Sequence, residues 1–300
     1  MDAMAGRRAR SLEELGALQG RFFRPDEVEA SIKSYRPRPS DVVISPFGKC
    51  GTTWLQQTFH TLRTRGDMDF DDISRVVPWI ETSAALGIDL EAPQRAEPRG
   101  FKSHLAYDAM PKGARYVVSL RDPKDATLSH FRFMEGWFIE PGAVSVADYV
   151  AVRLADRRRD YWHHLLSWWE VRHEPNVLLL SYEHMSAEPE ANIRRLAEFC
   201  GIPLDDELLA LTLERSSLAY MLAHKDRFDD AMMRRLSEER CGLPPGGDSA
   251  KVRIGKVGSH RHELPAETAA ALDARWREVV TPKLGFPDYA SLEAALRAGD

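Results

Sequence analysis

Cysteine is scarce in this sequence: its 300 residues contain only Cys50, Cys200 and Cys241, far apart along the chain. This number does not fit a disulfide-rich secreted fold, and the spacing lacks the pattern of cysteine ligands around a metal. We therefore expect no metal centre, and a protein that works in a reducing compartment, the cytoplasm.

Long apolar runs are missing as well. No stretch approaches the ~20 apolar residues of a membrane-spanning helix. Residues 1–16 contain three arginines, but the apolar run that follows the basic residues of a secretory signal is missing. Neither a membrane anchor nor a signal peptide is expected.

Positive charge is not in excess, because 41 basic and 46 acidic residues give a net charge of −5. Without an overall basic field, we expect no binding to nucleic acid and no stable insertion into membranes. Any anionic ligand must be held by a local cluster. The 43% hydrophobic and 29% charged residues are typical of a globular protein with a substantial core.

Short apolar runs alternate with segments of helical spacing. The runs predict strands over residues 41–45, 100–105, 114–120 and 176–182. Helices are expected from Thr52 to about Gly66, from Pro123, around 157–173, and over 188–200, 204–214 and 266–280. This order predicts an α/β fold, a single three-layer domain with a central, mostly parallel sheet flanked by helices. We expect an N-terminal lead-in and helix over residues 1–40 and the domain over residues 41–290.

The segment 42–59 runs from a strand through glycines into a helix. Such a turn brings unpaired backbone N–H groups and the positive end of a helix dipole to one point. Lys49 adds a charge, and Thr52 and Thr53 add hydroxyl groups. The site is P-loop-like, but the lysine precedes Gly51 instead of following it, which weakens the alternative of a P-loop kinase.

A second anion site is predicted after the strand at 114–120. Arg121 stands where a kinase would carry a magnesium-binding acid, directly before the expected helix N-cap Asp122. Ser129 is seven residues beyond Asp122, near the same face of the helix. The late segment 242–265 is glycine-rich and basic, which suggests a flap over an anion; a plain surface loop is the alternative.

The motifs GKCGTTW, FKSHL, YVVSLRDPKDATLSHF, LLLSYEHM and VRIGKVG occur in this order within residues 41–260. Together they resemble the cytosolic-type sulfotransferases, which use 3′-phosphoadenylyl sulfate (PAPS) as donor. The resemblance implies PAPS as the cofactor, without a metal, and a small-molecule hydroxyl acceptor. It implies that the donor is bound by Lys49, Cys50, Gly51, Thr52, Thr53, Trp54, Arg121, Ser129, Tyr182, Ser216, Leu218, Met221, Arg253, Ile254 and Gly255.

Three of these positions depart from the family pattern. Cys50 replaces a serine, Ile254 replaces a lysine and so removes a phosphate contact, and Leu218 replaces an aromatic residue near the adenine. The animal dimer motif is absent, and the sequence makes no prediction about oligomeric state.

By the same resemblance, His104 is the base that takes the acceptor's proton, since histidine titrates near neutral pH. Lys49 and Lys102 would neutralise the charge that develops during transfer. Trp79, Trp137 and Phe138 are candidates for the acceptor pocket, with ordinary core packing as the alternative. The acceptor expected is a lipophilic alcohol, phenol or glycolipid. A nucleotide-binding module without catalysis remains a further alternative.

Overall fold

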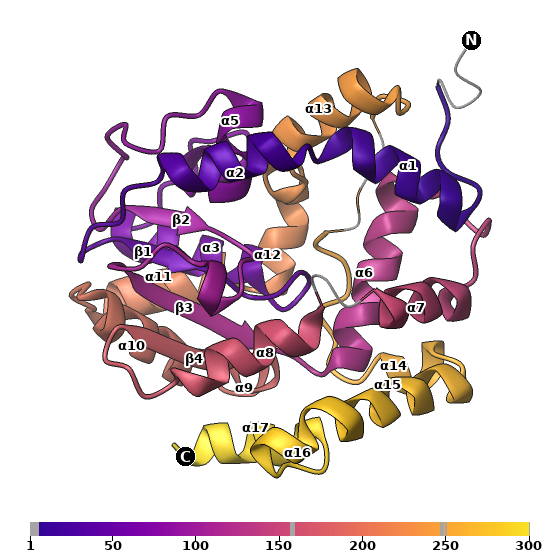
Figure 1. The fold of residues 1–300 in the computed structure, drawn as a ribbon. Helices are drawn as coiled ribbons and strands as arrows, with labels where there is room; N and C mark the ends of the chain where they lie inside the picture. Colours follow the sequence, from indigo (N-terminus) through magenta and orange to yellow (C-terminus); the bar gives the residue numbers. More distant parts are fainter. Residues whose placement is uncertain (1–5, 157–159, 247–248, 250, 300) are drawn as a thin grey trace.

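The computed structural model describes residues 6–156, 160–246, 249 and 251–299. Its centre is a four-stranded sheet in the order β2-β1-β3-β4, with every pairing parallel (Figure 1). The strands are β1 (Val42–Ile44), β2 (Gly100–Lys102), β3 (Arg115–Leu120) and β4 (Val177–Ser181). The parallel sheet predicted from the alternation of strands and helices is confirmed.

Successive residues of each strand face opposite sides of the sheet, as the two-residue period requires. Val43 and Val118 pack into one core, beneath α8 (Tyr161–Glu170), α15 (Ala266–Val279) and α17 (Tyr289–Ala298). Val42 and Val117 pack into a second core, against α3 (Thr52–Thr64), α10 (Pro189–Cys200) and α11 (Asp206–Arg215). Helices therefore cover both faces, which confirms the three layers.

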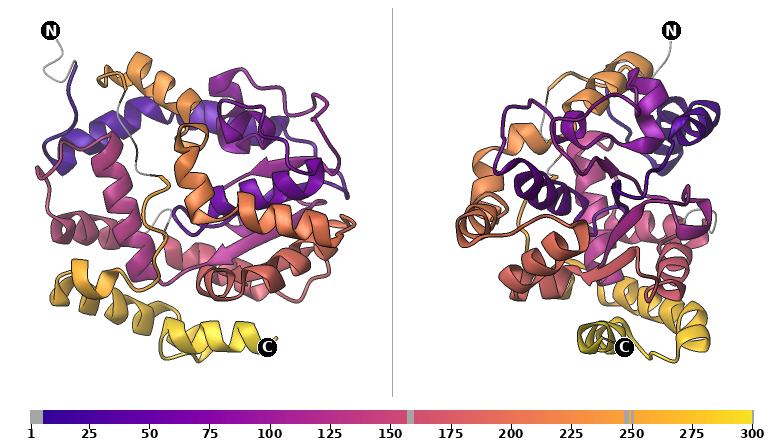
Figure 2. Two further views of the ribbon diagram at one scale, coloured as in Figure 1. Left: turned by 180° about the vertical axis from the view of Figure 1, so that it is seen from behind. Right: turned by 90° about the vertical axis from the view of Figure 1, so that its left-hand side faces the viewer.

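A third core lies beside the sheet, where β2 and β3 point (Figure 1). It joins α1 (Leu12–Phe22), α6 (Pro123–Trp137), α7 (Val146–Ala155) and α13 (Ala231–Cys241). Seen from behind, α1 and the C-terminal helices lie on opposite sides of the molecule (Figure 2). The cavity described below opens between this third core and the sheet, so the N-terminal helix takes part in the site.

Most helices begin and end within a few residues of the expected positions. The helix expected around 157–173 begins at Tyr161, because the Asp160 carboxylate caps it by accepting from the His163 N–H; residues 157–159 lie outside the described ranges. The remaining α-helices are α2 (Pro25–Ser34), α4 (Ile73–Val76), α5 (Ser83–Leu86), α9 (Tyr182–Ala187), α12 (Leu218–Ala223), α14 (His260–Glu263) and α16 (Thr281–Leu284). Short 3₁₀ turns span Ile80–Thr82, Tyr107–Ala109 and Lys225–Phe228. Among the described helices, none has the length and apolar character needed to cross a bilayer.

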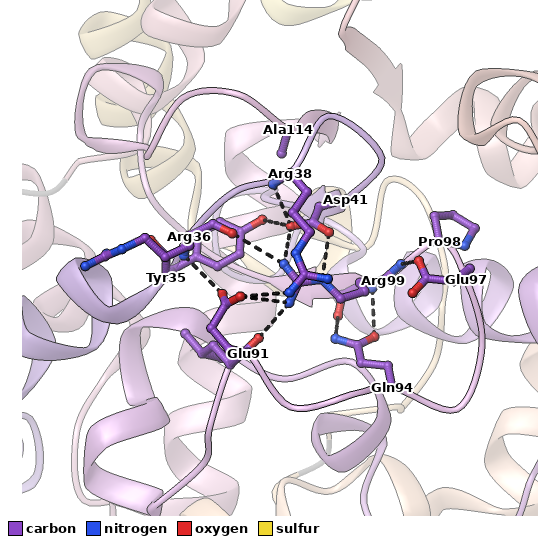
Figure 3. A network of polar contacts seen from close by, with 12 residues as sticks. Tyr35, Arg36, Arg38, Asp41, Glu91, Gln94, Glu97, Pro98, Arg99 and Ala114 are labelled. Atoms are coloured by element: carbon purple, nitrogen blue, oxygen red, sulfur yellow. Dashed lines mark hydrogen bonds and ion pairs between the residues drawn. The ribbon is translucent and has the colours of Figure 1, made fainter.

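A buried ion pair fixes the amino ends of β1 and β2 (Figure 3). Arg99 Nε and Nη2 donate to the two carboxylate oxygens of Asp41 at 2.8 and 2.7 Å. Both side chains are at most 1% exposed. The Tyr35 hydroxyl, at 3.1 Å, and the Arg38 backbone N–H, at 2.9 Å, donate to the same carboxylate, so its charge is fully compensated.

Candidate active site

The loop between β1 and α3 has a backbone shape that requires glycine. Gly51 has φ of 97°, and a Cβ there would lie 3.1 Å from the Tyr182 ring and 3.4 Å from Ser119 Oγ. Lys49 also has a positive φ, 69°. No side chain caps the start of α3, so its first N–H groups remain available for an anion.

Two buried polar atoms beside this loop have no hydrogen-bond partner in the described part of the chain: Thr52 Oγ1 and Arg121 Nε. Arg121 is otherwise held firmly. Its Nη1 donates to the Lys49 carbonyl at 3.0 Å and its guanidinium lies 4.2 Å over the Tyr182 ring. Unpaired donors in a buried position fit an anionic ligand that would complete their hydrogen bonds.

One cavity of about 570 Å³ brings the expected site residues together. Fourteen of the fifteen residues expected to bind the donor line it, as do His104, Lys102 and all three aromatic residues expected at the acceptor. Within the described residues, the exception is Cys50. Its side chain is fully buried, its N–H donates to the Phe47 carbonyl at 3.1 Å, and burial raises the pKa of its thiol to about 12. The loop therefore offers Gly51, Thr52 and Thr53 to a ligand rather than Cys50.

The part of the cavity where the donor is expected, called here the nucleotide half, ends at two aromatic rings, a leucine and a glycine. The Trp54 and Tyr182 rings meet edge-on at 5.5 Å. Leu218 packs directly on the flap, because a Cβ at Gly255 would lie 2.9 Å from its Cδ2. Gly255 also has φ of 63°, so the flap needs a glycine there on both counts.

His104 follows β2 and is oriented by two hydrogen bonds. Its Nδ1 donates to the Pro46 carbonyl at 2.7 Å, which leaves Nε2 as an unprotonated acceptor. Its own N–H donates to Glu81 Oε1 at 2.7 Å. Burial, then repulsion from Lys102, lowers the pKa of His104 to about 3. The imidazole is therefore neutral at physiological pH, with Nε2 as its unprotonated nitrogen.

The two expected catalytic lysines are buried, and burial lowers the pKa of Lys49 to about 7 and that of Lys102 to about 8. Lys49 Nζ lies 4.5 Å from the Phe133 ring centroid and donates to the Lys251 carbonyl at 3.4 Å. Lys102 Nζ lies 3.9 Å from the Trp79 ring centroid. Both lysine side chains thus place their charged ends over aromatic faces.

Asp230 is a site residue that the sequence analysis missed. Its Oδ1 lies 2.5 Å from Lys251 Nζ and 3.8 Å from Lys102 Nζ. Burial alone would raise the pKa of Asp230, but the two lysines hold it well below its usual range. No sequence signal marks this residue, because it stands at the start of α13 and meets its partners only through the fold.

The expected flap is held against the start of α6. The structure describes its residues 242–246, 249 and 251–265, whereas residues 247, 248 and 250 lie outside the described ranges. The Asp125 carboxylate accepts from the Gly258 N–H at 2.6 Å, from the His260 N–H at 2.9 Å and from His260 Nδ1 at 2.8 Å. Asp125 therefore holds this segment beside Arg121, whose Nη2 donates to the Lys256 carbonyl at 3.4 Å.

The other half of the cavity is aromatic. Trp137 and Phe138 line it and also pack in the third core, with ring centroids 5.8 and 5.3 Å from that of Phe22. Phe133 and Met134, which also line the cavity, belong to the segment 133–138 that the sequence suggests for the acceptor side. Three further apolar lining residues carry no signal in the sequence: Phe22, Phe23 and Met233.

No group of three or more His, Cys, Asp or Glu side chains in the described ranges is placed to hold a metal ion. The arrangement therefore consists of a phosphate loop, a buried arginine, two buried lysines and a neutral histidine around one cavity.

Comparison with known proteins agrees with this arrangement. A family model, the sulfotransferase domain, matches residues 39–283. The chain is 25% identical over 271 residues to luciferin sulfotransferase of Photinus pyralis, covering 76% of this chain and 70% of that protein. It is 29% identical over 204 residues to sulfotransferase 1B1 of Mus musculus, covering 63% and 68%. Its fold resembles a crystal structure of retinol dehydratase in complex with androsterone and inactive cofactor PAP, with a TM-score of 0.71, 19% identity, and coverage of 91% of this chain and 95% of that one.

Proposed function

This chain belongs to the sulfotransferase family, and from this premise we propose that it transfers a sulfuryl group from PAPS to a hydroxyl of a small, lipophilic acceptor. The acceptor would be an alcohol, a phenol or a glycolipid, and the nucleotide product adenosine 3′,5′-bisphosphate. One observation supports this most directly: the phosphate loop, Arg121 and His104 all face a single cavity.

PAPS, when bound, supplies an activated sulfuryl group. The N–H groups at the start of α3, with Lys49 and the hydroxyls of Thr52 and Thr53, would hold its phosphosulfate. The free Nε of Arg121 and the hydroxyl of Ser129 would hold its 3′-phosphate beneath the flap. The remaining donor contacts would come from Trp54, Tyr182, Ser216, Leu218, Met221, Arg253, Ile254 and Gly255.

The protein's own residues account for the proton and the charge. His104 Nε2 is unprotonated and would accept the proton of the acceptor hydroxyl, while the Pro46 carbonyl keeps its Nδ1–H fixed. Lys49 and Lys102 would leave their aromatic faces to compensate negative charge on the phosphosulfate. Trp79, Trp137 and Phe138 would form part of the apolar wall around the acceptor.

The first test compares thermal unfolding with adenosine 3′,5′-bisphosphate, ADP and ATP at equal concentration. A ligand at 100 times its dissociation constant stabilises the fold by about 2.7 kcal/mol, a shift of several degrees. We expect this shift only with the 3′-phosphorylated nucleotide, and we expect Arg121→Met to remove it. Arg194→Met, at an exposed ion pair with Glu190, is the matched control and should keep it.

An equal or larger shift with ATP would contradict the 3′-phosphate site and favour a kinase. A shift with the bisphosphate, but no transfer from PAPS to any of a panel of phenols and alcohols, would instead favour a nucleotide-binding module.

We further propose that the protein acts in the cytoplasm, where its three cysteines would stay reduced. All three are free and buried, as thiols that need no oxidising compartment. We also propose that residues 41–290 form the sulfotransferase domain and that residues 1–40 are an N-terminal lead-in and helix, which packs on the domain beside the cavity. Fractionation of cells that produce the protein, and folding of a chain beginning at residue 41, test these two points.

A further inference from the structure

One face of α6 forms a wall of the cavity. His130, Phe133, Met134 and Trp137 are spaced i, i+3, i+4 and i+7, the spacing of one helical face, and all four line the cavity. The last three are apolar. His130 is the polar member, and it is at the end of this face nearest the phosphate loop, because a Cβ at Gly48 would lie 3.7 Å from His130 Cδ2.

The hydrogen bond of His130 determines which ring nitrogen carries its proton. Its Nδ1 lies 2.5 Å from the hydroxyl oxygen of Tyr149 in α7. In the described residues this nitrogen is the one acceptor found for the Tyr149 hydroxyl. Arg153, beside the Tyr149 ring, can only donate. When the tyrosine O–H donates to Nδ1, a neutral imidazole carries its proton on Nε2.

His130 is neutral because of where it lies. Burial, then repulsion from Arg153, Lys49 and His104, lowers the pKa of His130 well below its usual value. The structure records no hydrogen bond for its Nε2 within the described residues. With this tautomer the two neutral histidines of the cavity differ, because Nε2 of His104 is an acceptor and Nε2 of His130 is a donor.

We propose that His130, oriented by Tyr149, is a specificity-determining residue whose Nε2–H donates to a second oxygen of the acceptor, beside the hydroxyl that reacts. This inference rests on the proposed function. The Nε2–H of His130 would favour acceptors with two neighbouring oxygens, such as a catechol, over acceptors with one. The oxygen belongs to the acceptor and not to the donor, because His130 shares its helical face with Phe133, Met134 and Trp137, whereas Ser129 and the phosphate loop serve the nucleotide.

Nitrogen NMR of the histidine side chains tests the proton position without any reaction. Uniformly ¹⁵N-labelled protein is compared with His130→Gln to assign the resonances. We expect Nε2 of His130 to carry the proton and Nδ1 to be unprotonated, and we expect Tyr149→Phe to abolish this preference. A proton on Nδ1 in the wild-type protein overturns the inference, whatever the protein is found to sulfonate.

Acceptor kinetics test the consequence, with 4-nitrophenol and 4-nitrocatechol as a matched pair and PAPS as donor. A neutral hydrogen bond changes kcat/KM by roughly three- to tenfold, so we expect that preference for the catechol. His130→Phe should remove it by lowering kcat/KM for the catechol and leaving the phenol nearly unchanged. His130→Gln places an amide N–H near the position of Nε2 and should retain most of it.

The two experiments separate failure of this inference from failure of the proposed function. If the wild-type protein modifies both acceptors equally, or if His130→Phe lowers both equally, His130 has only a structural role between α6 and α7. If neither acceptor is modified, the proposed function fails for these acceptors, and the NMR result alone then decides whether His130 presents a donor to the cavity.

Discussion

Lys251 of the flap and Asp230 of α13 form an ion pair, with Nζ and Oδ1 2.5 Å apart, and the same oxygen lies 3.8 Å from Lys102 Nζ. Lys251 of the flap and Lys102 at the carboxyl end of β2 therefore share one counter-ion. Because Lys49 also donates to the Lys251 carbonyl, the position of the flap and the charges of these lysines depend on each other.

We expect Asp230→Asn to destabilise the protein and to slow turnover. It leaves Lys102 and Lys251 buried without their counter-ion, and breaking a buried pair of this kind costs about 3–5 kcal/mol. Because the pKa of Asp230 is depressed in the folded state, its contribution is present above its unfolded pKa of about 4 and declines as the pH falls below it. Urea unfolding at pH 7 and pH 3 measures the loss of stability and its pH dependence, and steady-state rates with PAPS measure turnover.

Glu29→Gln is the control for Asp230→Asn. Glu29 pairs with Lys33, and both side chains are largely exposed, so this change should cost less than about 1 kcal/mol. An Asp230→Asn protein as stable as the wild type at pH 7 would show that the pair with Lys251 contributes nothing.

His104→Ala should abolish turnover and leave nucleotide binding intact. The imidazole is the base in the proposed reaction, whereas the nucleotide is held by the loop and Arg121. Since the pKa of His104 is lowered to about 3, the wild-type kcat/KM should show no loss between pH 7 and pH 5 from protonation of this residue. Steady-state rates across that range, with the bisphosphate thermal shift, measure both. The exposed His163, paired with Asp108, is the control, and His163→Ala should retain activity. Turnover by His104→Ala would show that another group is the base.

Binding of the nucleotide should take up protons above pH 7. In the free protein the pKa of Lys49 is about 7 and that of Lys102 about 8, and a bound anion favours their charged forms. Affinity for adenosine 3′,5′-bisphosphate should therefore weaken as the pH rises from 7 to 9. Calorimetry in two buffers of different ionisation enthalpy gives the number of protons taken up. Lys49→Met should reduce that number and Lys33→Met should not. Equal heats in the two buffers at pH 8 would contradict the lowered pKa values.

The nucleotide half of the cavity could be predicted from the sequence because its residues lie where strands end and helices begin. Lys49, Thr52 and Arg121 occupy such positions, and the parallel sheet brings these ends together. Cys50 shows the limit of this reasoning. Its place in the motif does not reveal that its N–H donates a hydrogen bond to the Phe47 carbonyl and is therefore not available to a ligand.

The acceptor half could not be predicted in the same way. Phe22 and Met233 come from α1 and the start of α13, and they meet through packing that no local pattern encodes. Asp230 was missed for the same reason. A single acid before a helix is usually a cap, and only the fold places it between Lys102 and Lys251.

Gly51→Ala should weaken both the fold and the phosphate loop. A residue with a Cβ is strained at φ of 97°, and this Cβ would press on the Tyr182 ring at 3.1 Å. We expect a loss of about 1–3 kcal/mol and a clearly weaker bisphosphate shift. Gly16→Ala in α1 should instead stabilise the protein by up to about 1 kcal/mol. An added Cβ at Gly16 would have no atom within 4 Å apart from its chain neighbours and the backbone of its own helix. Equal changes in stability for the two variants would show that Gly51 does not need its positive φ in the folded protein.

Arg99→Met should separate stability from binding. It leaves the Asp41 carboxylate buried at the amino end of β1. Its partners among the described residues are then the Tyr35 hydroxyl and the Arg38 N–H, and the expected cost is about 3–5 kcal/mol. This network fixes the amino ends of β1 and β2, whereas the cavity lies at their carboxyl ends. The dissociation constant for the bisphosphate, measured well below the midpoint of unfolding, should therefore remain within about twofold of the wild type, a difference of roughly 0.4 kcal/mol. Arg38→Met, which breaks the exposed pair with Glu91, is the control and should change stability by less than about 1 kcal/mol. A protein that unfolds like the wild type but binds poorly would show that the ion pair acts on the site itself, through the strands that connect them.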